Sequence, residues 1–230
     1  MTSSRRVGAA TSKTRTLLLD GAEHLMLAQG YAAVTYRGVA TQAGVTPGLV
    51  QYYFPALDDL LVALVRRGIE QSLARLATSL ETEPPLRAVW EDAGDKARSA
   101  LMAEFMALAN HHKKIRSELV KAGEQARTLA LAALSARSSE YPRSPDSPSP
   151  EALLFLMIST PRMIAMEETI GLSTFHAETV DFIERYLDRV EPRPRATPRR
   201  YRDQVLANDR KHDRPRGPAA ADPGSLSRPT

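Results

Sequence analysis

The sequence contains no cysteine, which excludes disulfide bonds, thiolate catalysis and metal sites with cysteine ligands. No run approaches the roughly 18 apolar residues of a membrane-spanning helix, and the first residues lack the apolar core of a secretory signal. We therefore expect a soluble, cytoplasmic protein with no membrane partner. Its 230 residues allow one or two domains with a sizeable core.

Sequence signatures of catalysis and cofactor binding are missing as well. There is no G-x-S-x-G nucleophile motif, no Gly-rich phosphate loop and no paired catalytic constellation. The five histidines are scattered, and the adjacent His111 and His112 would point about 100° apart on a helix, which is unsuited to binding one metal ion. We therefore predict that the protein is not an enzyme and holds no metal or cofactor.

The net charge of +4 is unevenly distributed along the chain. Residues 1–16 carry four Lys or Arg and no acid, and residues 191–230 carry ten Lys or Arg and five acids. The intervening residues 17–190 hold 17 basic and 22 acidic side chains, a net charge of −5. Because the basic charge lies at the two ends, the charge balance alone is only a modest argument for a nucleic-acid partner.

Residues 35–54 have the pattern of two short helices joined by a tight turn. Thr35 is suited to cap the first helix, and Gly44 to adopt the positive φ that ends it. Thr46 is suited to cap the second helix, and Pro47 stands at its first position, where a missing N–H costs nothing. The predicted inward-facing residues are Val39, Ala40, Ala43, Val50 and Tyr53. This arrangement predicts a helix-turn-helix, a motif that binds DNA.

The same segment resembles the TetR family of bacterial transcriptional regulators, from Arg15 to about Leu61. The resemblance rests on Leu18, Leu19, Ala22, Leu25, Met26, Gly30, Val39, Ala40, Ala43, Gly44, Val45, Gly48, Tyr53, Phe54, Leu60 and Leu61. The chain departs from the family pattern at Gln51, where a Tyr is usual, and at Leu57, where a Lys usually donates to a DNA phosphate. The departure at Leu57 implies weaker or differently distributed contacts to the DNA backbone.

The second helix of the motif, residues 46–53, carries no charged side chain, so its contacts to DNA bases must be uncharged. Gln51 is the candidate for a bidentate pair with adenine, and Pro47 and Leu49 are candidates for contacts with thymine methyl groups. Phosphate contacts are expected from the helix N-terminus and from Thr35, Arg37, Thr46 and Tyr52. Gly48 completes the exposed face.

We predict an all-α protein of about nine helices in four segments. The first is a basic arm at 1–10, and the second is a helix-turn-helix domain at 11–55. The third is a helical regulatory and dimerisation domain at 56–190, and the fourth is a disordered tail rich in Pro and Arg at 191–230. The arm is expected either to contact DNA or to remain solvated. The tail is expected either to raise nonspecific DNA affinity or only to solubilise the protein.

Within the regulatory domain, apolar periodicity predicts a long helix over residues 56–80, about 35 Å in length, that links the DNA-binding part to a second core. Breaks between the following helices are expected near Gly94, near His111 and at Gly123. Pro161 is expected to kink a strongly apolar helix over residues 150–171 by removing one backbone hydrogen bond.

Five of the seven methionines lie between residues 86 and 170. Methionine adapts to irregular apolar shapes, so this region is a candidate pocket for a small hydrophobic effector, and ordinary core packing is the alternative for each residue. The candidate pocket residues are Trp90, Met102, Phe105, Met106, Met157 and Met163.

The last two predicted helices are too apolar for one subunit to cover. The run Leu153–Ile158 leaves no polar face, and residues 174–190 present a second apolar side. We therefore predict a homodimer with a four-helix interface, as in similar proteins. The candidate interface residues are Leu153, Leu156, Phe175, Phe182, Ile183 and Tyr186.

The resemblance implies a dimeric repressor that binds a palindromic operator in double-stranded DNA and is released by a ligand. Two other interpretations stay open. The first is a DNA-binding regulator without an effector, which predicts a filled core around Met102 and Met163. The second is a helical protein-interaction module, which predicts no salt-dependent binding to duplex DNA.

Overall fold

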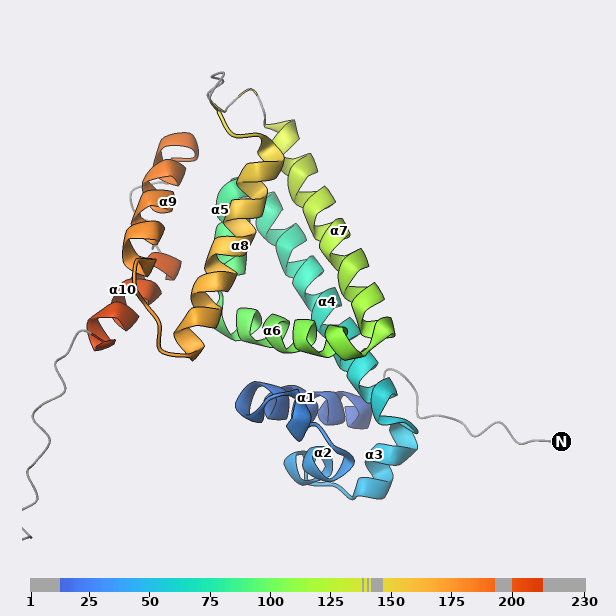
Figure 1. Cartoon of the computed structure of the whole chain (residues 1–230). Coiled ribbons are helices and arrows are strands. Elements are labelled where there is room, and N and C mark those ends of the chain that lie inside the picture. The colour runs from blue at the N-terminus through green and yellow to red at the C-terminus, as the bar shows by residue number, and fades with distance from the viewer. Residues whose placement is uncertain (1–12, 138, 140, 142–146, 193–199, 213–230) are drawn as a thin grey trace, which may run out of the picture.

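The computed structural model describes residues 13–137, 139, 141, 147–192 and 200–212 (Figure 1). The α-helices are α1 (Lys13–Gln29), α2 (Tyr36–Ala43), α3 (Pro47–Tyr53), α4 (Leu57–Thr82), α5 (Pro85–Ala93), α6 (Lys96–His111), α7 (Lys113–Ala136), α8 (Pro150–Thr169), α9 (His176–Val190) and α10 (Arg200–His212); a short 3₁₀ helix, η1 (Tyr31–Ala33), follows α1. These ranges contain no strand, so the prediction of an all-α fold is confirmed, with ten α-helices described instead of about nine.

Helices α1, α2 and α3 form a small head at one end of the molecule (Figure 1). Its apolar core contains the fully buried Leu18, Val39 and Val50. Side chains from α4, α6 and α7 complete the same core: Leu60, Leu61, Leu64, Val65, Phe105, Leu108 and Ile115. The head is therefore packed by residues well beyond position 55, where sequence suggested a domain boundary.

Phe105 of α6 reaches the core of the head by lying against Gly68 of α4. A Cβ atom at position 68 would stand 2.7 Å from Cε2 of Phe105, so only glycine leaves room for the ring. At this point α6 and α4 approach each other closely.

Above the head, α4, α7 and α8 lean together and α6 crosses below them, so that the helices outline a triangle in Figure 1. Helix α4 belongs to both parts of the molecule. Its first turns place Leu60 and Leu64 in the head, and its later part places Leu76 in a second core. With 26 residues, α4 is about 39 Å long, as expected for a strut between the two parts.

The second core is locked by a buried polar network between α5 and α9. Trp90 donates its indole N–H to Glu184 at 2.9 Å, and the guanidinium of Arg87 contacts Asp188 at 2.7 Å and Glu184 at 3.6 Å. The carboxylate of Glu191 accepts the backbone N–H groups of Leu86 and Arg87 at 3.0 and 2.9 Å. These hydrogen bonds and ion pairs connect α5 to α9 and to Glu191, the residue that follows α9.

The prediction of a disordered tail is wrong for residues 200–212, which form α10. Tyr201 of α10 is 2% exposed and packs edge-to-face on Trp90, with 5.1 Å between the ring centroids. Val205 is also buried, and Arg202 pairs with Asp181 of α9 at 2.7 Å. The predicted arm at 1–10 and the rest of the predicted tail, residues 193–199 and 213–230, lie outside the described residues.

The predicted breaks near Gly94 and near His111 are confirmed: α5 ends at Ala93, directly before Gly94, and α6 ends at His111. The break at Gly123 is wrong: α7 continues through it, since a single glycine costs only about 1 kcal/mol in a helix whose other contacts are intact. Pro161 lies inside the continuous helix α8 and is itself buried.

No single helix in the described ranges is long and apolar enough to cross a membrane. Only the pair α3 and α4, bent by 69° at their junction, reaches the required length and composition together.

Candidate DNA-binding surface and effector cavity

The helix-turn-helix is closed by the two caps and the turn predicted from sequence. The hydroxyl of Thr35 accepts the backbone N–H of Gly38 at 3.0 Å, and that of Thr46 accepts the N–H of Leu49 at 3.4 Å. Gly44 has φ 66° and ψ 34°, in the left-handed region, and ends α2. Pro47 occupies the first position of α3. These local predictions are confirmed, and together they set the direction in which α3 leaves the turn.

Tyr36, which sequence analysis did not single out, anchors the far end of α3. Burial raises the pKa of its hydroxyl, and Asp59 raises it further. The protonated hydroxyl lies 3.0 Å from the carbonyl oxygens of both Phe54 and Pro55, the residues that follow α3. The guanidinium of Arg15 stands 5.0 Å above the ring of Phe54, a cation–π contact with α1. Helix α3 is thus held at both ends.

The face of α3 that points away from the core is the one assigned to DNA. Val50 is fully buried and Tyr53 half-buried, which leaves the opposite side of the helix free of the protein interior. The candidate residues Thr35, Arg37, Thr46, Pro47, Gly48, Gln51 and Tyr52 are exposed, and Leu49 is half-buried. All of these candidates are thus accessible to solvent, and Arg37 is the one charged side chain among them.

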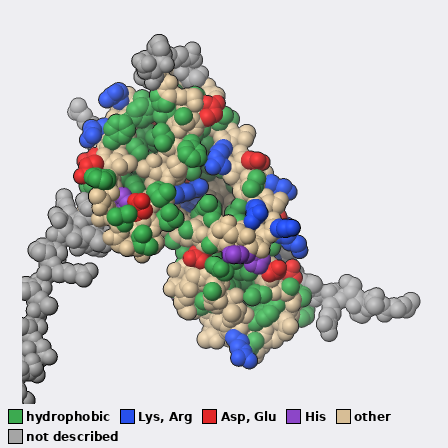
Figure 2. All heavy atoms as spheres, in the orientation of Figure 1, with side chains coloured by type: hydrophobic (Ala, Val, Ile, Leu, Met, Phe, Trp, Pro, Cys, Tyr) green, Lys and Arg blue, Asp and Glu red, His purple; other side chains and the backbone are tan. Residues whose placement is uncertain are grey.

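A cavity of about 510 Å³ lies inside the triangle of helices. In Figure 2 this face of the molecule is hollowed between α7 and α8 and carries basic side chains at the hollow. The cavity is lined by residues of α4 to α8: Ile69, Ser72, Leu73, Leu76, Val89, Asp92, Ala93, Met102, Met106, Ala109, Asn110, Arg116, Leu119, Val120, Ala122, Gly123, Glu124, Ala126, Arg127, Ala130, Ile158 and Arg162.

Only two of the six residues predicted to line a pocket, Met102 and Met106, line this cavity. Trp90 and Met157 are buried in the second core, and Phe105 is buried in the core of the head. Met163 is 51% exposed on α8 and does not line it. Which side of its helix each residue occupies therefore decides whether it faces the cavity or a core, and methionine and aromatic content alone does not give this.

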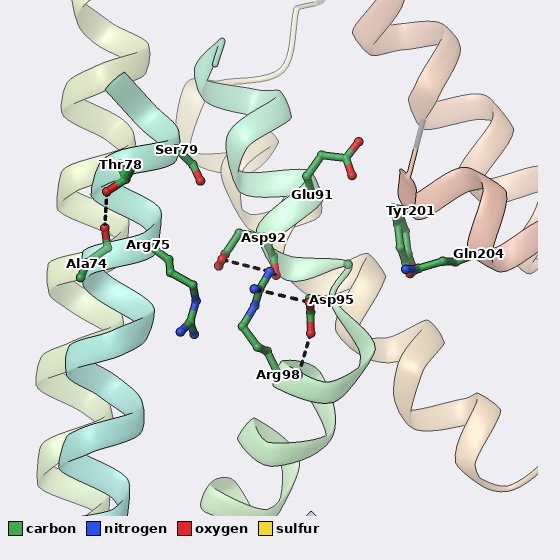
Figure 3. Close-up of a pocket in the computed structure, with 11 residues that line it drawn as sticks. Ala74, Arg75, Thr78, Ser79, Glu91, Asp92, Asp95, Arg98, Tyr201 and Gln204 are labelled. Atoms are coloured by element: carbon green, nitrogen blue, oxygen red, sulfur yellow. Dashed lines mark hydrogen bonds and ion pairs between the residues drawn. The ribbon is translucent and has the colours of Figure 1, made fainter. Parts of the chain in front are cut away.

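A second, more polar cavity of about 520 Å³ lies between α4, α5 and α10 (Figure 3). Arg98 contacts Asp92 and Asp95 there, at 3.4 Å in each case, and Arg75 of α4 points into the same space. Tyr201 closes one side, and burial raises the pKa of its hydroxyl far above the usual range. Asp92 lines both cavities, so its pairing with Arg98 reduces the negative charge that it presents to the first one.

Helix α6 contacts both the cavity of about 510 Å³ and the head. Met102 and Met106 line the cavity, whereas Glu104 lies between them and accepts the backbone N–H of Tyr31, in η1 of the head, at 2.8 Å. Where α6 meets α7, Nδ1 of His112 stands 3.6 Å from Asp58 at the start of α4. Helix α6 thus forms part of the cavity wall and also contacts the head.

Large apolar side chains are exposed on α8, α9 and the loop between them. The exposed fractions are 58% for Phe155, 49% for Leu156, 74% for Phe175 and 66% for Phe182. Of the other candidate interface residues, Leu153 and Tyr186 are half-buried and Ile183 is buried within its own subunit. Several large apolar side chains are thus left in water on this part of the molecule, where exposed apolar patches are typical of interaction surfaces.

Comparison with known proteins agrees with this geometry. Residues 18–64 match the sequence model described as bacterial regulatory proteins, tetR family. An HTH-type transcriptional regulator in the dhlA 5' region of Xanthobacter autotrophicus, itself uncharacterized, is 36% identical over 98 residues, which are 43% of this chain and 44% of that protein. The HTH-type transcriptional repressor KstR2 of Mycobacterium tuberculosis is 25% identical over 111 residues, 48% of this chain and 52% of that protein. The match therefore spans about half the length of these curated relatives.

The likeness of fold extends further along the chain. The crystal structure of a TetR transcription regulator from Haloarcula marismortui superposes with a TM-score of 0.62 at 18% identity, covering 77% of this chain and 97% of that one. A transcriptional regulator from a Rhodococcus species covers 86% and 97% of the two chains, with a TM-score of 0.56 at 19% identity. The N-terminal segment of this chain thus matches the model for tetR-family bacterial regulatory proteins over residues 18–64, and its all-α fold is similar to that of solved transcriptional regulators.

Proposed function

We propose that the protein is a transcriptional regulator that binds a palindromic operator as a homodimer and is released from DNA by a small molecule bound in the cavity between α4 and α8. The observation that carries this proposal is the exposed face of α3, which is capped by Thr46 and packed from behind by Val50. A short helix held in this way, with its N-terminus and one side free, has the form that enters a major groove.

Base contacts come from uncharged side chains in this proposal. Gln51 is exposed and pairs with adenine, and Pro47 and Leu49 contact thymine methyl groups. Thr35, Arg37, Thr46 and Tyr52 contact phosphates on either side. Because α3 itself is neutral, affinity for the DNA backbone depends on few charges, and the loss of affinity with rising salt is expected to be moderate.

Dimerisation follows from the exposed apolar face of α8 and α9. The side chains of Phe155, Leu156 and Phe182 would be removed from water by the same surface of a second copy across a two-fold axis. Such a dimer presents two copies of α3 to successive major grooves, about 34 Å apart, which requires an operator with inverted symmetry.

Release by a ligand is supported by the cavity and by the position of α6. A cavity of about 510 Å³ is of the size that holds a small organic molecule, and it stands where a regulator without an effector would have a filled core. An effector that binds more tightly when α6 is displaced would move the head through the contact of Glu104 with Tyr31. We propose repression as the default outcome, in line with the family resemblance.

The test is selection of bound duplexes from a random pool, followed by binding measurements over a range of salt concentrations. We expect an enriched inverted repeat, a salt-dependent affinity, and loss of binding in the double variant Gln51→Ala, Tyr52→Ala but not in Gln71→Ala, which alters an exposed glutamine on α4. Sedimentation equilibrium should give twice the chain mass of 25.3 kDa. A pool without an enriched repeat, together with a monomeric mass, would refute the proposal and favour a protein-interaction module.

A further inference from the structure

The cavity inside the triangle of helices is lined mostly by apolar side chains, and its charged lining residues are three arginines and two acids. Arg127 of α7 and Arg162 of α8 line it, and within the part of the chain that the structure describes neither guanidinium has a hydrogen-bond or ion-pair partner. Arg116 also lines the cavity, but its guanidinium donates to the carbonyl oxygens of Ala109 and Asn110 at 3.1 Å each and so closes the end of α6. Two cationic groups are therefore left facing the cavity.

The acidic residues at the cavity do not neutralise these two arginines. Asp92 is paired with Arg98, whose Nη2 lies 3.4 Å from its carboxylate and 3.2 Å from its carbonyl oxygen. Glu124 lines the rim of the cavity and makes no ion pair with Arg127, three residues along α7, among the described contacts. Three arginines against two carboxylates, one of them already paired, leave an excess of positive charge at this cavity.

The surroundings of Arg162 are unfavourable to its charge. Shielding from water lowers its pKa, the nearby charge of Arg127 lowers it further, and only Asp92 acts in the opposite direction. The residue nevertheless stays accessible to solvent, as a group at an open cavity would. Bringing an anion to such a pair of guanidiniums relieves their repulsion and supplies the missing hydrogen-bond acceptors.

Arg127 lies against the backbone of its own helix, α7, beside the cavity. At Gly123, a Cβ atom would stand 3.0 Å from Nη1 of Arg127, so the guanidinium rests over bare backbone one turn earlier in the helix. Gly123 itself lines the cavity. The guanidinium of Arg127 therefore lies close to the backbone of Gly123, at the wall of the cavity.

We propose that the cavity binds an amphipathic anion, a molecule with a carboxylate or phosphate held by Arg127 and Arg162 and an apolar body packed against the side chains of α4 and α6. Leu73, Leu76, Met102 and Met106 line the part of the cavity that would take the apolar body. This inference rests on the proposed function, since it names the chemical class of the effector. It replaces a purely hydrophobic ligand by one with an acidic head.

The test compares probes that share one apolar chain and differ in the head group. Decanoate, decyl phosphate and decan-1-ol are titrated calorimetrically into the full chain, into the double variant Arg127→Gln, Arg162→Gln, and into Lys121→Gln, which removes a positive charge from the outer side of α7 without touching the cavity. We expect one or both acids to bind at least about tenfold more tightly than the alcohol, which corresponds to about 1.4 kcal/mol. The preference between carboxylate and phosphate identifies the head group.

In the double variant this preference for acids should disappear, while decan-1-ol binds as it does to the unaltered chain, which shows that the cavity is intact. Lys121→Gln should keep the preference. Equal affinity for acid and alcohol in the unaltered chain overturns the inference, and so does a preference that survives in the double variant. Failure of all three probes to bind overturns both the inference and the proposed effector cavity. Selective binding of an acid without any change in DNA affinity supports the inference but refutes ligand release.

Discussion

Replacing Glu104 tests whether the head of the molecule responds to the cavity. The carboxylate of Glu104 accepts the backbone N–H of Tyr31 at 2.8 Å, and this contact is the hydrogen bond from α6 to the segment that follows α1. Gly30, with φ 79°, stands beside it, and a Cβ there would be 3.7 Å from the same carboxylate. The neighbouring Met102 and Met106 line the cavity, so one turn of α6 carries both contacts.

The expected magnitude follows from the kind of bond that is lost. A hydrogen bond to a charged acceptor contributes about 1.5–3 kcal/mol, and this one is only partly buried, which favours the lower end of that range. We therefore expect Glu104→Ala to lower the free energy of unfolding by about 1.5 kcal/mol, and Glu104→Gln, which keeps an oxygen acceptor, by less. The same contact can contribute no more than this free energy to the coupling between cavity and head, so the ligand-induced loss of DNA affinity should shrink by at most about tenfold.

The assay is fluorescence anisotropy on the selected operator with and without decanoate, well below the melting temperature of each variant. Glu81→Ala, which removes an exposed carboxylate near the far end of α4, serves as the control and should leave both stability and release unchanged. If Glu104→Ala unfolds at a lower denaturant concentration but is released from DNA as fully as the unaltered chain, the contact only stabilises the fold, and the proposed route from cavity to head is wrong.

Three further substitutions test separate parts of the molecule. Gly44→Val should lower the free energy of unfolding by about 1–3 kcal/mol, measured by chemical denaturation, because position 44 has φ 66° and no atom within 4 Å of a new Cβ, so the cost is backbone strain alone; an unchanged midpoint would show that the turn tolerates side chains. Gln51→Ala should relax base preference at one or two operator positions by about 1–3 kcal/mol in competition binding without altering the melting temperature, and an unaltered preference would remove Gln51 from the set of base-reading residues. Phe182→Glu should shift sedimentation equilibrium toward monomer while the fold is retained, because this side chain is 66% exposed in the single subunit; a dimer of undiminished strength would place the interface elsewhere.

The helix-turn-helix was predictable because each of its parts depends on near neighbours in sequence. Thr35 and Thr46 cap helices through N–H groups three residues later, and Gly44 adopts a backbone conformation that other residues rarely adopt. Tyr36 was missed although it holds the end of α3, because its partners Phe54 and Pro55 are 18 and 19 residues away and no periodic pattern connects them.

The regulatory part was predictable only in outline. The apolar spacing gave the helices, but the same spacing cannot say whether a methionine or an aromatic ring faces a core or an empty space. Trp90 and Phe105 were expected at a pocket and are buried in two different cores, one paired with Glu184 and the other packed against Gly68. Helix α10 was missed because Tyr201 and Val205 are isolated apolar residues in a basic, proline-rich segment, and their burial depends on a surface formed by α5 and α9.

By itself, the sequence determined the all-α fold, the absence of cysteine chemistry and the geometry of the DNA-binding motif, since these follow from composition and from interactions within a few residues. Only the tertiary structure decided which residues line the cavity and which charges remain unpaired in it. Arg127 and Arg162 are 35 positions apart on different helices, and nothing in their local sequence distinguishes them from solvated surface arginines. Their proximity results from the packing of α7 against α8, and long-range packing is the part of folding that local patterns do not encode.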